Sequence, residues 1–163
     1  MAELAEINGL PKFFIAFKSV KNQKYLAYHK DQTTPLLPHL LQFSGKDSHS
    51  QYARFKVEPD VNHPGLVHIK SDYNDKYLRL ASEDSLWIVA AADKKQQNKN
   101  LWHSTLFKPE LVEFRPPQGV YKFIHVYKGN PIGPKSGPGF HDILAVDGEN
   151  PALIVEIVGK HTG

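Results

Sequence analysis

The chain has 163 residues, of which 40% are hydrophobic and 23% charged, so it matches the size of one domain with enough apolar side chains for a single core. Its 20 basic and 17 acidic residues are mixed along the sequence and give a formal charge of +3, which does not indicate a nucleic-acid-binding surface. The sequence contains no cysteine, which excludes disulfides and thiolate chemistry.

Residues 1–12 are expected to form an N-terminal tail. Glu3 and Glu6 stand where a secretory signal would have basic residues followed by an unbroken apolar run. No stretch of the chain approaches the roughly 20 apolar residues that a membrane-spanning helix needs. Together with the lack of cysteine, these features predict a cytoplasmic or nucleocytoplasmic protein.

An internal repeat follows this tail. The segment 17–28 returns as 69–80, shifted by 52 positions, and six of the twelve positions are identical. Phe55-Lys56 returns as Phe107-Lys108 with the same shift. Each copy of the longer segment reads as a strand, a polar turn and a second strand, which predicts a β-hairpin.

Each copy continues with a second pair of expected strands, so that every unit contains about four. These strands are expected at 40–43 and 53–57 in the first unit, at 86–90 and 104–108 in the second, and at 120–126, 143–146 and 153–158 in a third. The Gly- and Pro-rich segment Gly129 to Gly139 is expected to be a long hairpin connection. Units at about 13–60, 65–112 and 119–158 predict an all-β fold, a single β-trefoil domain over 13–163 with three four-stranded repeats and pseudo-threefold symmetry.

No motif of catalysis or cofactor binding is found. The nine histidines form neither a His-x-His nor a His-Glu-x-x-His pattern, so no metal site is predicted. The Lys-Ser pair within Gly129 to Gly139 lacks the spacing of a phosphate loop, and no nucleophile elbow or glycosidase carboxylate pair is recognisable. We therefore expect a protein without enzymatic activity and without a cofactor.

Aromatic and amide side chains gather near the expected turns of the second unit. They are Tyr73, Asn74, Tyr77, Trp87, Trp102 and His103. An aromatic face can pack on the C–H groups of a galactose-type ring, while amide and carboxylate groups bind the hydroxyls. Tyr77 and Trp87 have the apolar mates Tyr25 and Leu40 in the first unit, which favours core positions for both, whereas Tyr73, Asn74 and His103 are compatible with a binding site added to the repeat.

Several longer motifs carry a resemblance to a known family. They are Leu-Leu-Gln-Phe-Ser (40–44), Phe-Lys-Val-Glu-Pro (55–59), Gly-Leu-Val-His-Ile-Lys-Ser (65–71), Asn-x-Lys-Tyr-Leu (74–78) and Thr-Leu-Phe-Lys-Pro (105–109). With these motifs the chain resembles amaranthin-type plant agglutinins, closely over 13–113 and loosely thereafter. The resemblance implies a β-trefoil lectin for glycans that contain galactose or N-acetylgalactosamine.

The resemblance also implies a sugar site at the loop before the second unit's tryptophan, completed by a neighbouring trefoil. In this chain the loop is 82–87, where Asp84 and Leu86 replace the family's amide and aromatic residues. Asp84 can still accept hydrogen bonds from sugar hydroxyls. A homodimer would supply the neighbouring trefoil. The expected carbohydrate-binding residues are Asp84, Ser85, Trp87, Tyr73, Asn74 and His103.

A second hypothesis remains open, because this fold hosts unrelated functions on its loops. The chain could be a protein-interaction trefoil, similar to a protease inhibitor or a targeting domain, that has lost sugar binding. The segment Gly129 to Gly139 would then be the candidate interaction loop.

Overall fold

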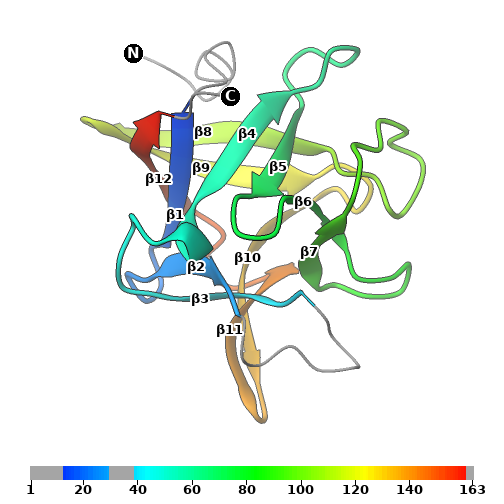
Figure 1. Ribbon diagram of the computed structural model, residues 1–163. Helices are drawn as coiled ribbons and strands as arrows, with labels where there is room; N and C mark the ends of the chain where they lie inside the picture. Colours follow the sequence, from blue (N-terminus) through cyan, green and yellow to red (C-terminus); the bar gives the residue numbers. More distant parts are fainter. Residues whose placement is uncertain (1–12, 30–38, 161–163) are drawn as a thin grey trace.

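The computed structural model describes residues 13–29 and 39–160, which form twelve strands and one short 3-10 helix (Figure 1). The strands are Phe13–Ser19 (β1), Tyr25–Tyr28 (β2), Leu41–Gly45 (β3), Phe55–Pro59 (β4), Val67–Ser71 (β5), Lys76–Leu80 (β6), Ile88–Ala92 (β7), Phe107–Arg115 (β8), Gln118–His125 (β9), Asn130–Gly137 (β10), Phe140–Val146 (β11) and Leu153–Lys160 (β12). The helix η1 covers Gln51–Ala53. The expected tail, residues 1–12, lies outside the described residues. Within the described residues, no helix has the length and hydrophobicity that a membrane crossing requires.

Six of the strands close into a barrel. β1 pairs with β4 and β12, β5 pairs with β4 and β8, and β9 pairs with β8 and β12, all antiparallel. Closure leaves none of these strands with an unpaired edge. The barrel strands occupy the upper half of Figure 1.

The other six strands form three hairpins, β2–β3, β6–β7 and β10–β11, at one end of this barrel. Neighbouring hairpins contact one another through single backbone pairs, which join Leu40 to Val89, Trp87 to Ala145 and Gln42 to Ile143. A six-stranded barrel capped by three hairpins is a β-trefoil, which confirms the fold predicted from the repeat.

The threefold symmetry is visible in the strand register. The last strand of each unit pairs with the first strand of the next in the same way, through Phe55 and Ser71, Phe107 and His125, and Leu153 and Ser19. The core lies inside the barrel, where the ring centroid of Phe17 is 5.4 Å from that of Phe55 and 5.3 Å from that of Phe123. All three phenylalanines are fully buried, and each contributes about 1.5–3 kcal/mol by leaving water.

The residues shared by the repeats build the turn between the first two strands of a unit. Asn22 Nδ2 donates to the Phe43 carbonyl at 2.9 Å, and Asn74 Nδ2 donates to the Ala90 carbonyl at 2.9 Å. Each asparagine Oδ1 also accepts a bond from the backbone N–H two residues later. The same turn has a left-handed residue in all three units, namely Gln23 (φ 60°), Asp75 (φ 61°) and Gly129 (φ 79°). This turn recurs with the same geometry in each unit.

The repeated tyrosine joins one unit to the preceding one. Tyr25 Oη donates to the Glu156 carboxylate at 3.0 Å, and Tyr77 Oη donates to Glu58 at 2.8 Å. A second repeated residue, a lysine in the first strand of each unit, places its ammonium over the tyrosine ring: Lys18 Nζ is 5.5 Å from the Tyr25 centroid and Lys70 Nζ is 5.2 Å from the Tyr77 centroid. The residues that the units share therefore have structural roles, and functional features are to be sought where the units differ.

The segment Gly129 to Gly139 differs from expectation. It contains strand β10, which pairs with β9 and β11, so the prediction of a long connection was wrong. Proline lacks a backbone N–H, but its carbonyl can still accept a hydrogen bond, and the strand uses these carbonyls. Pro131 O accepts from Asp147 N at 3.1 Å, and Pro134 O accepts from Glu149 N at 2.7 Å. Only Pro138 and Gly139, between β10 and β11, form an exposed tip.

Candidate functional site

The six residues predicted to bind carbohydrate lie at three places in the fold. Tyr73 and Asn74 belong to the turn between β5 and β6, and 84–87 belong to the loop between β6 and β7. His103 lies in the long loop between β7 and β8. The three groups contact different neighbours, and of the six residues only His103 lines one of the two pockets described below.

Asn74 serves its own turn. Both of its polar side-chain atoms are bonded to backbone groups, as are those of its mate Asn22 in the first unit. Its amide is therefore committed to positioning Tyr73, the residue immediately before it.

The loop before Trp87 combines an exposed carboxylate with a half-buried indole. Ser85 Oγ accepts the Trp87 N–H at 2.9 Å, which fixes the end of the loop. The Trp87 ring meets Phe140 edge-on, with centroids 5.1 Å apart, and its backbone pairs with Ala145 of β11. Trp87 thus helps to join two hairpins, while the exposed Asp84 forms no hydrogen bond or ion pair with any other described residue.

Tyr73 belongs to an aromatic cluster that sequence reasoning missed. Its ring lies between those of Tyr28 and Tyr52, with centroid distances of 4.8 Å and 4.6 Å. Tyr28 and Tyr52 line a pocket of about 560 Å³, which we call the tyrosine pocket. Tyr28 Oη is in turn 3.0 Å from His39 Nδ1. The cluster joins the first unit to the second through three half-buried rings.

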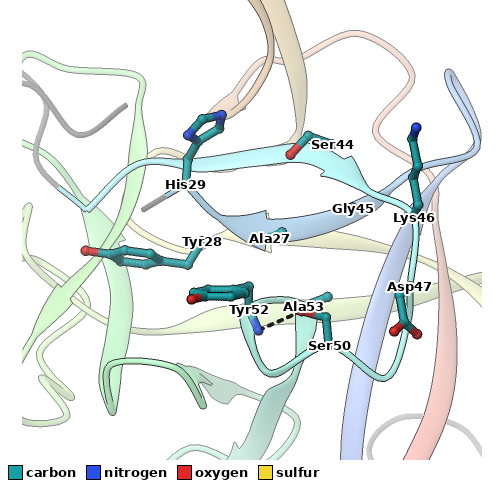
Figure 2. A pocket seen from close by; sticks show the side chains of 10 residues that line it. All are labelled: Ala27, Tyr28, His29, Ser44, Gly45, Lys46, Asp47, Ser50, Tyr52 and Ala53. Atoms are coloured by element: carbon teal, nitrogen blue, oxygen red, sulfur yellow. Dashed lines mark hydrogen bonds between the residues drawn. The ribbon is translucent and has the colours of Figure 1, made fainter. Parts of the chain in front are cut away.

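The tyrosine pocket lies among β2, β3 and η1 of the first unit. Figure 2 shows Tyr28 and Tyr52 toward one end and Lys46 and Asp47 at the other. Ser50 Oγ accepts the Tyr52 N–H at 3.2 Å, which caps η1 and orients the tyrosine. The remaining lining residues are Ala27, His29, Ser44, Gly45 and Ala53. The pocket therefore offers aromatic surface, small side chains and several hydroxyl and charged groups.

The three units treat the equivalent position differently. Four residues after the left-handed turn residue stand Ala27, Arg79 and Gly133. Ala27 lines the open tyrosine pocket, whereas Gly133 is covered by the loop after β11, since a Cβ there would lie 3.0 Å from Pro151 Cα. Arg79 lines a second pocket of about 430 Å³, which we call the Arg79 pocket. The same position of the repeat therefore lines an open pocket in the first unit and a basic pocket in the second, and it is covered in the third.

His103 lies in the Arg79 pocket. Its ring meets that of Trp102 edge-on at 5.2 Å, and Trp102 in turn lies under the Arg79 guanidinium at 5.4 Å. Both aromatic residues lie in the loop 93–106 between β7 and β8, light green at the upper right of Figure 1, and line the pocket together with Arg79 of β6 and Ala92 of β7. His103 is therefore part of a different environment from Tyr73 and Asp84.

A buried Asp60–His68–Thr105 chain has the residue types of a catalytic triad. His68 Nε2 donates to Asp60 Oδ1 at 2.8 Å, and His68 Nδ1 lies 2.7 Å from Thr105 Oγ1. Burial lowers the pKa of His68 and outweighs the opposing effect of Asp60. All three side chains are shielded from solvent, so no substrate reaches them. Their hydrogen bonds instead connect the β4–β5 loop, which carries Asp60, to the segment just before β8, which carries Thr105.

Metal binding has no support within the described residues. In 13–29 and 39–160, no group of three or more His, Asp or Glu side chains is placed to hold a metal ion.

Comparisons with known proteins agree with this architecture. No curated protein sequence matches the chain significantly. Among solved structures it is similar to the designed threefold-symmetric protein ThreeFoil (TM-score 0.63, 12% identity, covering 88% of this chain and 99% of that one). It is also similar to SeviL bound to asialo-GM1 saccharide (TM-score 0.61, 15% identity, 90% and 98%) and to Polyporus squamosus lectin bound to a sialylated epitope (TM-score 0.60, 12% identity, 89% and 48%).

The family is identified by sequence. The model of the agglutinin domain matches residues 8–133, which is more than half of the chain. The chain therefore belongs to the agglutinin domain family of carbohydrate-binding β-trefoil lectins.

Proposed function

We propose that the protein is a non-catalytic lectin that binds glycans containing galactose or N-acetylgalactosamine in the tyrosine pocket. The observation that carries the proposal is the pocket itself, which has about 560 Å³ of space beside two tyrosine rings. Small-molecule sites typically have about 300–1,000 Å³ and combine aromatic walls with a few polar groups. The sugar class is supported by the motifs that resemble amaranthin-type agglutinins.

The lining residues suit a neutral sugar. The aromatic surface of Tyr28 and Tyr52 would pack on the C–H face of a galactose-type ring. Hydroxyl groups of Ser44 and Ser50 and the Asp47 carboxylate would bind the sugar hydroxyls at the rim. Tyr73 braces both rings, and Asn74 holds the turn that carries Tyr73.

The loop before Trp87 is a second glycan contact in this proposal. Asp84 and Ser85 are at its surface, and Trp87 adds a half-buried indole. A second copy of the chain in a homodimer would complete this contact. Two linked sites per particle would then strengthen weak binding of multivalent glycans.

A glycan array with competition by free N-acetylgalactosamine tests the proposal. Tyr52→Ala should weaken binding by at least about 10-fold, since it removes half of the aromatic wall. Asp84→Ala reports on the second contact separately. Phe114→Ala is the matched control, because Phe114 is an exposed aromatic residue on β8 that lines neither pocket.

The two classes of function give different results. Galactose- or N-acetylgalactosamine-selective binding that weakens in Tyr52→Ala and persists in Phe114→Ala supports the lectin. A silent array from correctly folded protein would overturn it and favour a protein-interaction trefoil, for which the exposed Pro138–Gly139 tip is the candidate surface.

A further inference from the structure

The Arg79 pocket is basic, unlike the tyrosine pocket. Besides Arg79 it is lined by Ala92, Lys94, Lys95, Gln96, Trp102 and His103, and it has about 430 Å³ of space. Three of these side chains, Arg79, Lys94 and Lys95, are cationic at neutral pH. The glycan proposed for the tyrosine pocket makes no use of this second site.

Arg79 is held in place with most of its donors unused. Its guanidinium lies over the Trp102 ring at 5.4 Å, and its Nη1 donates to the Leu80 carbonyl at 2.7 Å. A guanidinium carries five N–H donors, and the remaining ones have no partner among the described residues. Arg79 therefore presents a fixed, half-buried fork that matches a carboxylate or sulfate group.

The charge of the pocket is only partly compensated. Lys95 pairs with Glu58 at 2.9 Å, and the Asp93 carboxylate pairs with Lys76. Asp93 also attracts both Arg79 and Lys94 from a distance, but neither cation has a carboxylate within ion-pair range among the described residues. Arg79 and Lys94 therefore line the pocket without a direct ion-pair partner among the described residues, and their charge attracts an entering anion.

The first unit shows that the fold does not require this charge. Gly45 and Ala92 occupy equivalent positions, because they pair with the repeated residues Tyr25 and Tyr77. Two residues further on, the first unit has Asp47 where the second has Lys94, and Ala27 likewise corresponds to Arg79. At both of these repeat positions, the second unit therefore has a basic residue where the first unit has a neutral or acidic one.

Aromatic groups complete the pocket. The run 93–100 has no aromatic residue within it, which is why its lysines alone read as a solvated loop. The structure returns Trp102 and His103 to the same pocket as Lys94 and Lys95. A ring-shaped ligand with one acidic group would satisfy both the cations and these aromatic side chains.

We propose that the Arg79 pocket binds an acidic saccharide, with Arg79 and Lys94 holding its sulfate or carboxylate group and Trp102 and His103 contacting the sugar ring. The site is separate from the tyrosine pocket. It would allow the lectin to engage an acidic residue of a glycan in addition to a neutral one.

Titration calorimetry on the full chain tests this site with N-acetylgalactosamine 6-sulfate and its unsulfated parent. We expect tighter binding of the sulfated sugar by about 10-fold or more, and loss of that preference in Arg79→Ala, as for a charge-assisted bidentate contact. Lys94→Glu is the second variant, because Lys94 is exposed and its replacement leaves the packing intact. Lys99→Glu is the charge-matched control, since Lys99 is exposed on the same loop but does not line the pocket.

The outcomes separate this site from the tyrosine pocket. The preference for sulfate should persist in Tyr52→Ala and change by no more than about twofold in Lys99→Glu. Equal affinity for both sugars in the wild type, or an equal loss in Lys94→Glu and Lys99→Glu, would overturn the proposal. Displacement of the sulfated sugar by inorganic sulfate at the same concentration would also overturn it, because the site would then recognise the free anion.

Discussion

Acid should destabilise this fold through His125, the third-unit counterpart of Ser19 and Ser71. Its ring is fully buried beside Phe107, with centroids 5.4 Å apart. Nδ1 accepts the Lys128 N–H at 3.2 Å, while Nε2 has no hydrogen-bond partner among the described residues. Burial, with a smaller effect of the nearby Lys128 charge, lowers the pKa of His125 from 6.5 to about 4.

The folded protein loses stability in acid because the unfolded chain binds a proton at His125 more readily. Below pH 6.5 the unfolded chain binds a proton at His125, whereas the folded chain does so only near pH 4. The contribution of this group is therefore complete above pH 6.5 and is lost as the pH falls from 6.5 toward 4. At about 1.4 kcal/mol per pH unit, the loss is about 2 kcal/mol at pH 5.

Urea denaturation at pH 7 and pH 5 measures this effect. His125→Ser installs the residue of the other two units and should have a free energy of unfolding that falls less on acidification, by about 2 kcal/mol, whatever its stability at pH 7. His68, whose pKa is also lowered by burial, contributes equally to both proteins, so the difference isolates His125. Identical pH dependence in wild type and variant would refute the reasoning.

Three further changes test the structural roles assigned to the repeat. Phe17→Ala should lower the free energy of unfolding by about 3–5 kcal/mol, because it empties the centre of the barrel, and a loss as small as that of the exposed Phe114→Ala would contradict the core assignment. Asn74→Ala should cost about 1–3 kcal/mol in the same urea experiment, since it leaves the Ala90 carbonyl without its donor; an unchanged midpoint would argue against the turn role. Tyr77→Phe should cost about 1.5–3 kcal/mol through the lost bond to Glu58, and a neutral result would show that this link between units is dispensable.

The β-trefoil was predictable because the repeat encodes its hairpins directly. The shared asparagine builds the turn and the shared tyrosine bonds to a glutamate of the preceding unit. These residues recur at a constant spacing, so an internal comparison of the sequence detects them. Strand β10 was missed because its prolines resemble loop residues, and their use as acceptors depends on the loop after β11.

The two pockets proposed as binding sites were less predictable. Tyr28 and Tyr52 lie 24 positions apart in the sequence, and they form one aromatic cluster only because Tyr73 packs between them in the folded chain. Trp102 reaches Arg79 through a long loop whose path no local pattern indicates. One sequence feature could have indicated both pockets: the first unit has Ala27 at the repeat position where the second unit has Arg79.

The measurement that tests the central proposal most directly is an NMR titration of the backbone amides with N-acetylgalactosamine. We predict saturable shifts in 27–29, 44–47, 50, 52 and 53, which line the tyrosine pocket, and their loss in Tyr52→Ala. An absence of saturable shifts, or shifts confined to the loop 82–87, would contradict the assignment of sugar binding to this pocket.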